Sequence, residues 1–218
     1  MLELGVKVFL SYLIGSLNGA LLIGKFYGGV DIRELGSGNA GGTNALRTQG
    51  KFFALLVMIV DIGKGVLPVL LLPTLDIAGI GLEPAVSRDW LIFACGGAAI
   101  FGHCFPVWFD FAGGKGAATT IGVLAAIEPS VLAAGGLTWL GMLFVFGYVG
   151  LATVTAAFAI PAVLTLTGFA EHRDVILFTS IVAVFILFTH RSNMRDLFTG
   201  GAAQDIGFSL LGRLTGRA

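Results

Sequence analysis

The sequence is short of charge, and this shortage bounds the class of protein. Charged residues make up 12% of the 218 positions, whereas hydrophobic residues make up 56%. A soluble domain carries about 25% charged residues because most of its surface faces water. A chain with so little charge is suited to lipid, where only helices or closed barrels satisfy the backbone. The apolar runs are long and do not alternate as barrel strands do, so the sequence predicts an all-α protein that crosses a membrane several times.

Other absences exclude further classes. The net charge is zero, so nothing favours nucleic acid as a partner. The two cysteines, Cys95 and Cys104, make neither a metal motif nor a disulfide framework. The opening stretch MLELGVKVFLSYLIGS lacks a basic region and a signal-cleavage site, so we interpret it as a retained first span.

Seven apolar segments are candidate spans, since a bilayer core needs about 20 apolar residues. They cover approximately residues 4–23, 52–75, 89–109, 117–127, 131–147, 151–168 and 175–189. The fourth, ended by Glu128 and Pro129, is too short for full thickness and is either a span through thin bilayer or a re-entrant piece. We expect seven transmembrane helices, with five as the alternative if the fourth and fifth form a hairpin that does not cross.

The placement of lysine and arginine predicts the orientation. Alternate loops and the C-terminal tail hold most of these residues, namely Lys25, Arg33, Arg47, Lys51, Lys115, Arg191, Arg195, Arg213 and Arg217. The remaining loops hold only Arg88 and Arg173, and Lys7 lies near the start of the chain. This bias puts the N-terminus outside and the C-terminus in the cytoplasm.

Three polar clusters fall on the predicted cytoplasmic side, where polar residues in such a chain are informative. The first, SGNAGGTNALR, runs from Ser37 to Arg47. Its glycines allow several backbone N–H groups to point into a nest for phosphate oxygens, and Arg47 can add a bidentate contact. The alternative is a flexible linker, which would not need its two asparagines, its threonine and its arginine together.

The second and third clusters also contain basic residues at helix ends. GHCFPVWFDFAGGKG, from Gly102 to Gly116, leads directly into an apolar helix, so Lys115 and the helix N-terminus form a candidate anion site. The alternative is a positive anchor at a helix start. The third cluster, from Thr189 to Gly200, places His190 and Asn193 on one helix face. The alternative there is a snorkelling basic end.

Two further features lie deeper in the apolar segments. Asp61 and Lys64 are three residues apart, so they can pair on one helix face, and Lys64 is also within reach of the anionic site. Cys104 beside His103 raises the alternative of a thiolate nucleophile, although lone cysteines in apolar helices usually behave as small hydrophobic residues.

The clusters supply cations and glycine-rich backbone but almost no carboxylates. A metal site would need converging Asp, Glu or His ligands, so we expect phosphate recognition with no metal and no cofactor. Two functions fit: an enzyme that joins a water-soluble phosphate compound to a lipid-soluble one, and a membrane transporter of a phosphorylated solute. Transporters place their site near the midplane between related halves, and the sequence shows neither feature, which favours the enzyme.

These strings resemble the motifs of bacterial glycerol-3-phosphate acyltransferases that use acyl phosphate as donor. SGNAGGTNALR, VDIGKG, GHCFPVWFDFAGGKGAAT and HRSNMRDLFTG match in order and spacing, to about Gly200. The resemblance implies a seven-helix enzyme of phospholipid synthesis in the bacterial inner membrane, with its active site facing the cytoplasm. Such an enzyme moves a fatty acyl group from acyl phosphate to the sn-1 hydroxyl of glycerol 3-phosphate, giving lysophosphatidic acid and phosphate.

Roles for individual residues follow from these motifs. We expect catalytic roles for Ser37, Asn39, Lys115 and His190. The expected substrate-binding residues are Gly38, Gly41, Thr43, Asn44, Arg47, Lys64, His103, Gly114, Thr153, Arg191 and Asn193. No histidine is paired with a carboxylate in the sequence, so a phosphate oxygen of the donor is one candidate base, and covalent catalysis by Ser37 is the rival hypothesis.

We expect one membrane-embedded domain over residues 1–204 and a tail over 205–218 that lies on the membrane surface. The family's glutamate two residues after the glycine of the third motif is Ala202 in this chain, so the role of that glutamate does not transfer. The expected partners are glycerol 3-phosphate, fatty acyl phosphate and membrane lipid, and we expect a monomer.

Overall fold

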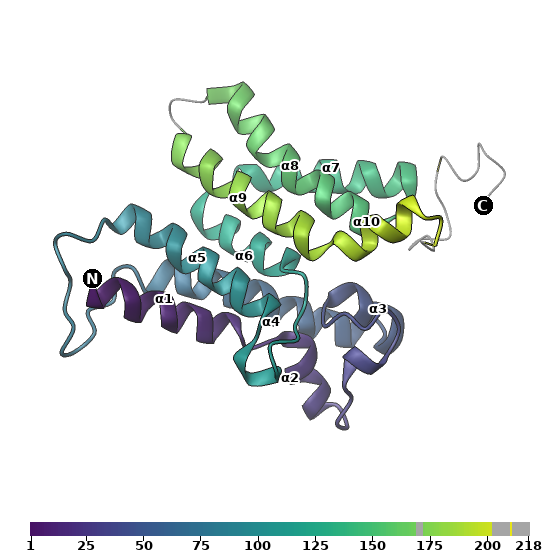
Figure 1. Cartoon of the computed structure of the whole chain (residues 1–218), viewed down its shortest axis with the longest axis horizontal. Coiled ribbons are helices and arrows are strands. Elements are labelled where there is room, and N and C mark those ends of the chain that lie inside the picture. The colour runs from purple at the N-terminus through teal and green to yellow at the C-terminus, as the bar shows by residue number, and fades with distance from the viewer. Residues whose placement is uncertain (169–171, 202–209, 211–218) are drawn as a thin grey trace. The chain divides into compact units, whose positions relative to one another are not determined.

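The computed structural model describes residues 1–168, 172–201 and 210. Throughout these residues the regular elements are helices, as the predicted all-α class requires (Figure 1). The chain forms two compact units, Met1–Ile127 and Glu128–Ala218, called here the first and second units. The single domain over 1–204 stays a prediction. Ala202 and all of the predicted tail except Leu210 lie outside the described residues.

The first unit is built around one central helix. Its α-helices are α1 (Leu2–Gly15), α2 (Gly19–Phe26), α3 (Gly42–Gln49), α4 (Lys51–Leu71), α5 (Arg88–Cys104) and α6 (Ala117–Ile127). Short 3₁₀ turns η1 (Ile32–Glu34) and η2 (Val107–Phe109) lie in the two long loops. α4 packs against all five other α-helices, and α1 lies beside α5 (Figure 1).

The second unit is a smaller helical group. It contains α7 (Val131–Phe146), α8 (Val149–Gly168), α9 (Arg173–Thr189) and α10 (Arg191–Phe198). α8 packs against both α7 and α9, and the short α10 packs on α8 and α9. A bend of 58° separates α9 from α10, with His190 at the junction.

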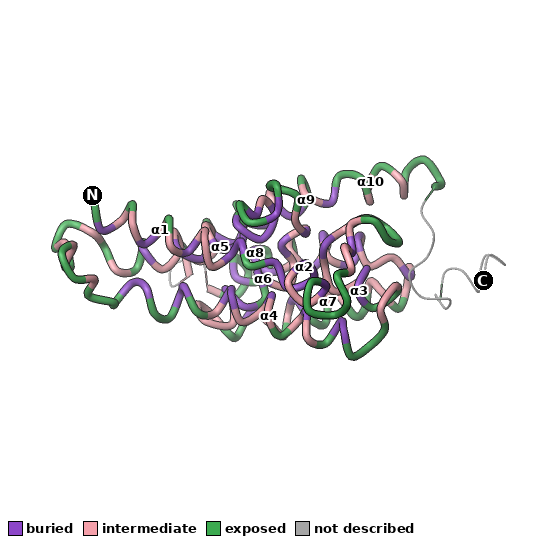
Figure 2. Tube along the Cα trace, turned by 90° about the horizontal axis from the view of Figure 1, so that it is seen from below, coloured by how far each residue is buried: buried purple, intermediate pink, exposed green. Residues whose placement is uncertain are grey.

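Polar groups of the first unit point inward and large apolar side chains point outward. Asp61 and Lys64 are buried on α4, whereas Ile59 and Leu67 of the same helix are about half exposed or more. Figure 2 shows buried and exposed residues in close succession along the helices of the first unit. This arrangement suits a lipid environment, because apolar side chains are favourable in lipid and unpaired charges are costly there.

Small residues let α4 and α6 approach closely. A Cβ at Gly65 would lie 2.3 Å from the Thr119 carbonyl oxygen, and one at Gly122 would lie 2.0 Å from the Ile62 carbonyl oxygen. No side chain fits at either distance, so the two backbones touch directly, as in small-residue contacts between membrane helices.

Three helices are long and apolar enough to cross a bilayer: Lys51–Leu71, Arg88–Phe109 and Val149–Gly168. Counting each of two bent helix pairs as one span gives five among the described residues. All seven predicted segments are helical, but α6 and α7 are shorter than a full span. The count of seven crossings therefore stays a prediction.

The first predicted span is wrong as a single helix. It breaks after Gly15, and α2 starts at Gly19 with a bend of 49°. Asn18 explains the new start, because its side-chain oxygen caps α2 by accepting from the Leu21 N–H at 3.1 Å. The third predicted span, 89–109, agrees with the apolar stretch Arg88–Phe109. Within it α5 ends at Cys104, because Pro106 disfavours helix in the residue before it.

A buried cluster of ion pairs lies at the start of α1, the end opposite this break. Glu3 and Lys7 have fully buried side chains and pair at 2.7 Å, and Lys7 Nζ also donates to the Pro73 carbonyl at 3.2 Å. Arg88 of α5 donates to Glu3 Oε2 at 2.8 Å, and the Glu83 N–H donates to the same oxygen at 2.7 Å. Lys7 and Arg88, which the sequence pattern placed among the outer charges, are therefore both paired with Glu3, Lys7 fully buried and Arg88 partly exposed.

Candidate active site

Asn44 shapes the first polar loop, Ser37 to Arg47. Its side-chain oxygen accepts from the Ser37 N–H at 2.9 Å, and its amide donates to the carbonyls of Ile32 and Leu35 at 3.1 and 2.9 Å. Gly38 has a φ of 71°, a conformation that favours glycine. A single buried amide thus folds the loop back onto the start of α3.

The donors of this loop differ from the predicted nest. The N–H groups of Ser37, Gly38 and Gly41 are used internally, by Asn44, Leu35 and Asn39 respectively. The first turn of α3 has no side-chain cap, so its N–H groups provide the unsatisfied donors that a helix N-terminus directs at an anion. The N–H groups of this loop that could face an anion are therefore those of Gly42 and Thr43, with Asn39 and Arg47 close by in the chain.

The GGKG turn, Gly113–Gly116, is tied to the end of α5. The Gly113 N–H donates to the Cys104 carbonyl at 3.2 Å, and the Gly114 N–H donates to the His103 carbonyl at 3.1 Å. These two amides are consequently not the anion donors of this turn. What the turn offers instead is Lys115, a half-buried residue held directly before α6.

Gly114 is the point where the two loops meet. A Cβ there would lie 2.7 Å from the Ala40 carbonyl oxygen of the first loop and 2.2 Å from Nε2 of His103. The structure therefore brings the Ser37 loop and Lys115 together, although they are far apart in the sequence.

Arg33 is a second link between the loops that the sequence did not reveal. Its guanidinium donates to the carbonyls of Phe109 and Ala112 at 3.0 and 3.3 Å, and it pairs with Asp31 at 2.7 Å. This pairing lowers the pKa of Asp31 and raises that of Arg33, chiefly through their side-chain hydrogen bonds. Lys25 adds a cation–π contact, 4.9 Å from the centre of the Phe109 ring.

The turn before GGKG has an unusual backbone. Asp110 and Phe111 have φ values of 56° and 57°, in the left-handed region that non-glycine residues rarely adopt. Such a conformation costs about 1–3 kcal/mol per residue and persists where surrounding structure enforces it, most often at functional sites. Here the Phe111 N–H donates to the Pro106 carbonyl at 3.0 Å, which closes the turn.

A buried group of ionisable residues lies under both loops. Asp61 Oδ1 accepts from Lys64 at 2.8 Å and lies 3.4 Å from His103 Nδ1. Both Lys64 and His103 are almost fully buried, at 4% and 2% exposed. The predicted Asp61–Lys64 pair is confirmed, and the histidine–carboxylate contact is one that the sequence had not suggested.

The residues of the third cluster lie in the second unit. His190 is buried, and its Nδ1 lies 2.8 Å from the Ile186 carbonyl, which requires the proton on Nδ1 for a hydrogen bond. Arg191 donates to the Phe188 carbonyl at 2.9 Å and lies over the Phe188 ring. Asn193 packs on Gly150, and a Cβ added at Gly150 would lie 2.9 Å from the Cβ of Asn193.

Thr153 has structural partners within the second unit. Its hydroxyl donates to the Val149 carbonyl at 2.8 Å and accepts from Trp139 at 3.2 Å. The bond from Trp139 joins α7 to α8. A substrate-binding role for Thr153 stays a prediction without a contact that supports it.

The fold and the polar loops define a class: a helical integral membrane protein with a candidate anion site of basic side chains and helix N-termini. Across the described residues, no group of three or more His, Cys, Asp or Glu side chains is arranged to hold a metal ion. The chain belongs to the glycerol-3-phosphate acyltransferase family, whose model matches residues 6–200.

Individual relatives agree with this assignment over most of their length. A glycerol-3-phosphate acyltransferase of Neisseria meningitidis serogroup C is 42% identical over 88% of this chain and 92% of its own, and one of Aquifex aeolicus is 36% identical over 88% and 94%. The crystal structure of PlsY (YgiH), an integral membrane glycerol 3-phosphate acyltransferase, in its glycerol 3-phosphate form is 34% identical, with a TM-score of 0.79 over 97% of this chain and 98% of that one. Its lysophosphatidic acid form has a TM-score of 0.77 over 92% and 94%.

Proposed function

We propose that this protein is an acyltransferase that moves a fatty acyl group from acyl phosphate to the sn-1 hydroxyl of glycerol 3-phosphate. The hydroxyl oxygen attacks the carbonyl carbon, the bond from that carbon to the phosphate oxygen breaks, and lysophosphatidic acid and inorganic phosphate leave. The observation that carries the proposal is the meeting of the two loops at Gly114, which brings two sets of anion-binding groups together in a chain of this family.

The two sets suit two phosphate esters. The uncapped start of α3, with Ser37 and Asn39 in the preceding loop, faces the acyl phosphate and the oxyanion that forms at its carbonyl. Lys115 and Arg47 hold the phosphate of glycerol 3-phosphate. Phosphate-binding roles for His190, Arg191 and Asn193, which lie in the second unit, stay predictions. Gly38 allows the backbone to turn at its φ of 71°, Gly41 leaves room for the Asn39 side chain, and Thr43 contributes an N–H from the first turn of α3.

The proton of the attacking hydroxyl goes to a phosphate oxygen of the donor. Within the first unit, the Ser37 hydroxyl makes no hydrogen bond to a histidine or carboxylate that would activate it as a nucleophile. Cys104 is no better placed, since it is only 5% exposed. A search for an acyl-enzyme by mass spectrometry, with palmitoyl phosphate as the only substrate, distinguishes the routes: direct transfer gives no adduct, and an adduct on Ser37 would refute it.

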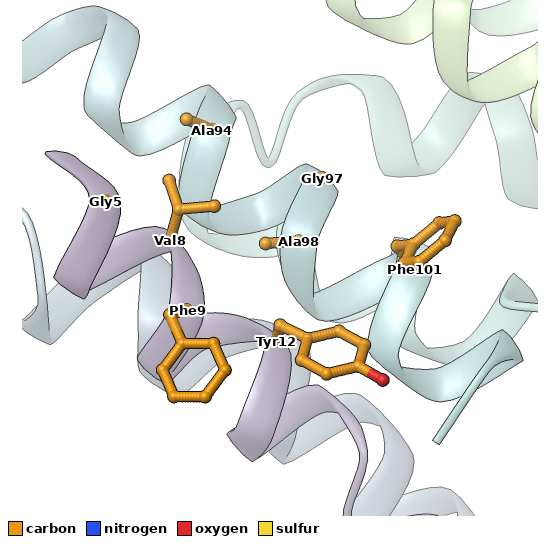
Figure 3. Close-up of a pocket in the computed structure, with 8 residues that line it drawn as sticks. All are labelled: Gly5, Val8, Phe9, Tyr12, Ala94, Gly97, Ala98 and Phe101. Atoms are coloured by element: carbon orange, nitrogen blue, oxygen red, sulfur yellow. The ribbon is translucent and has the colours of Figure 1, made fainter. Parts of the chain in front are cut away.

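A groove between α1 and α5 fits the acyl chain. It has a volume of about 570 Å³ and an almost wholly apolar lining: Gly5, Val8, Phe9, Tyr12, Ala94, Gly97, Ala98 and Phe101 (Figure 3). Gly5 and Ala94 lie at one end and Tyr12 and Phe101 at the other. The Tyr12 end adjoins the GGKG turn, because the Tyr12 hydroxyl donates to the Phe105 carbonyl at 2.9 Å and the Gly113 N–H donates to the neighbouring Cys104 carbonyl.

Substitution at the far end of this groove tests the assignment. From Gly5 to Tyr12 the groove follows about 10 Å of helix, at about 1.5 Å per residue. Ala94→Phe fills the end away from the GGKG turn, so activity should fall for long acyl phosphates and persist for short ones. Leu67→Phe, at an exposed position of α4 outside the groove, is the matched control. An unchanged chain-length profile in Ala94→Phe would mean that the groove holds bilayer lipid only.

We further propose seven crossings, with the N-terminus outside, the C-terminus in the cytoplasm of a bacterial cell, and both loops at the cytoplasmic face of the inner membrane. Three, five and seven spans all put the termini on opposite sides, and α6, at about 16 Å by helix rise, would cross a locally thin region. In a background without Cys95 and Cys104, Gln49→Cys should resist an impermeant maleimide in intact cells, and Asp76→Cys should react. The reverse pattern would invert the topology.

Phosphate release from palmitoyl phosphate by the purified protein tests the reaction itself. Release should depend on glycerol 3-phosphate and should match the lysophosphatidic acid formed. Release without the acceptor, or uptake of glycerol 3-phosphate into protein-containing liposomes without release, would overturn the proposal. We also propose that a monomer suffices for activity, which single-chain nanodiscs can test.

A further inference from the structure

One buried carboxylate is connected to both anion-binding loops. Asp61 is fully buried on α4, and its Oδ1 accepts from the Gly19 N–H at 2.9 Å and from Lys64 Nζ at 2.8 Å, with His103 Nδ1 3.4 Å away. These three neighbours come from three different elements: the start of α2, α4 itself and the end of α5.

The first connection runs through the break between α1 and α2. Lys64, paired with Asp61, donates to the Leu17 carbonyl at 3.1 Å, and Asp61 itself binds the N–H of Gly19. These two bonds hold Asn18 between them. The Asn18 amide in turn donates to the Ala40 carbonyl of the first loop at 3.2 Å.

The second connection runs through His103. One ring nitrogen faces Asp61, and the other, Nε2, lies against Gly114, at 2.2 Å from where a Cβ would be. The residue after Gly114 is Lys115. Since Ala40 also touches Gly114, the two connections meet at the junction of the loops.

We propose that Asp61 is a positioning residue, which through Asn18 and His103 fixes the distance between the first loop and the GGKG turn. This inference rests on the proposed acyl transfer, because it assigns Asp61 to the alignment of donor and acceptor phosphates. Asp61 and His103 are buried beneath the loops, so they act through Asn18 and Gly114 rather than on substrate. Asp61 Oδ2 makes no hydrogen bond to any described residue, which is unusual for a buried carboxylate whose role is stability alone.

The alternative is that Asp61 and Lys64 merely neutralise each other inside the helices. A double replacement separates the two roles, because exchanging a buried ion pair for apolar residues of similar size is often neutral for stability. Asp61→Leu/Lys64→Met should therefore keep a melting temperature near that of the wild type. Its kcat per folded molecule should fall about 100-fold, the effect expected when reacting groups are displaced by about 1 Å. The KM for glycerol 3-phosphate should change little, because Lys115 and Arg47 are untouched.

The second buried pair of the first unit provides the matched control. Glu3→Leu/Lys7→Met removes another buried pair, at the other end of α1. It should alter stability, because Arg88 is left without its carboxylate partner, and leave kcat per folded molecule unchanged. Asn18→Ser provides a variant without any change in buried charge. Serine is also a good helix cap but does not reach Ala40, so kcat should fall while the melting temperature stays near that of the wild type.

Wild-type protein assayed in parallel separates the two proposals. A wild-type protein that releases no phosphate refutes the acyl transfer. An active wild type, with Asp61→Leu/Lys64→Met folded and equally active, refutes the positioning role. If the double variant does not fold, Asn18→Ser decides: wild-type kcat in that variant refutes the connection between Asp61 and the first loop.

Discussion

The contact at Gly114 makes a quantitative prediction for Gly114→Ala. The added Cβ would lie 2.2 Å from His103 Nε2 and 2.7 Å from the Ala40 carbonyl oxygen, whereas ordinary contact begins at 3.4 Å. The neighbours must therefore retreat by about 1.2 and 0.7 Å, distances that follow from these values. Ala40 is fully buried and His103 is 2% exposed, so neither can move without displacing the first loop or the end of α5.

The expected result is a loss of rate with the fold retained. Overpacking of this kind costs about 1–3 kcal/mol of stability, which a folded membrane protein can tolerate. A displacement of about 1 Å between reacting groups costs about 100-fold in rate. We therefore expect kcat for glycerol-3-phosphate-dependent phosphate release to fall about 100-fold, measured on protein whose thermal unfolding in detergent remains cooperative.

Gly63→Ala is the matched control for this substitution. Gly63 lies on α4, and an added Cβ there meets nothing within 4 Å. Its kcat should equal that of the wild type. Its melting temperature should be equal or slightly higher, since alanine favours helix. Folded Gly114→Ala protein with wild-type kcat would show that the two loops need not touch for turnover.

Four further outcomes follow from the site and the packing. Lys115→Ala should abolish turnover or strongly raise the KM for glycerol 3-phosphate; unchanged kinetics would remove Lys115 from the site. Arg33→Gln should lower kcat, because the carbonyls of Phe109 and Ala112 lose their hydrogen-bond donor. Because the pKa of Asp31 is lowered from 3.8, the Asp31–Arg33 ion pair of the wild type should hold at neutral pH and weaken only below about pH 4. Gly122→Leu should lower the melting temperature by separating α4 from α6, and a stable variant would contradict the backbone contact. Cys104→Ala should retain activity, whereas a folded but inactive variant would support the hypothesis that the Cys104 thiolate is the nucleophile.

Local sequence patterns were enough to find the helices and one ion pair. Long apolar runs placed all seven segments near their observed bounds, since apolar length and flanking turn residues are read directly from neighbouring positions. The Asp61–Lys64 pair was predictable because a spacing of three places both residues on one face of a helix.

Contacts between distant segments were beyond those patterns. Nothing in the spacing of Arg33, Phe109 and Ala112 indicates that they touch, and the same holds for Asp61 and His103. The break after Gly15 was missed because the residues on either side of Ser16 and Asn18 are apolar enough to be interpreted as one continuous span. Its cause is a capping side chain, Asn18, whose other bond reaches Ala40 in a later loop. The sequence also does not show that the N–H groups of Gly113 and Gly114 donate to carbonyls of α5.

The ion cluster at the start of α1 has a consequence for the order in which the protein is made. Glu3 and Lys7 are four residues apart and can neutralise each other as soon as the first helix forms, whereas Glu83 and Arg88 emerge from the ribosome about eighty residues later. A nascent chain that stops before Arg88 therefore leaves one glutamate oxygen in the membrane without its guanidinium. Arrival of α5 supplies that partner, so the cluster closes only after the chain has been made to the start of α5.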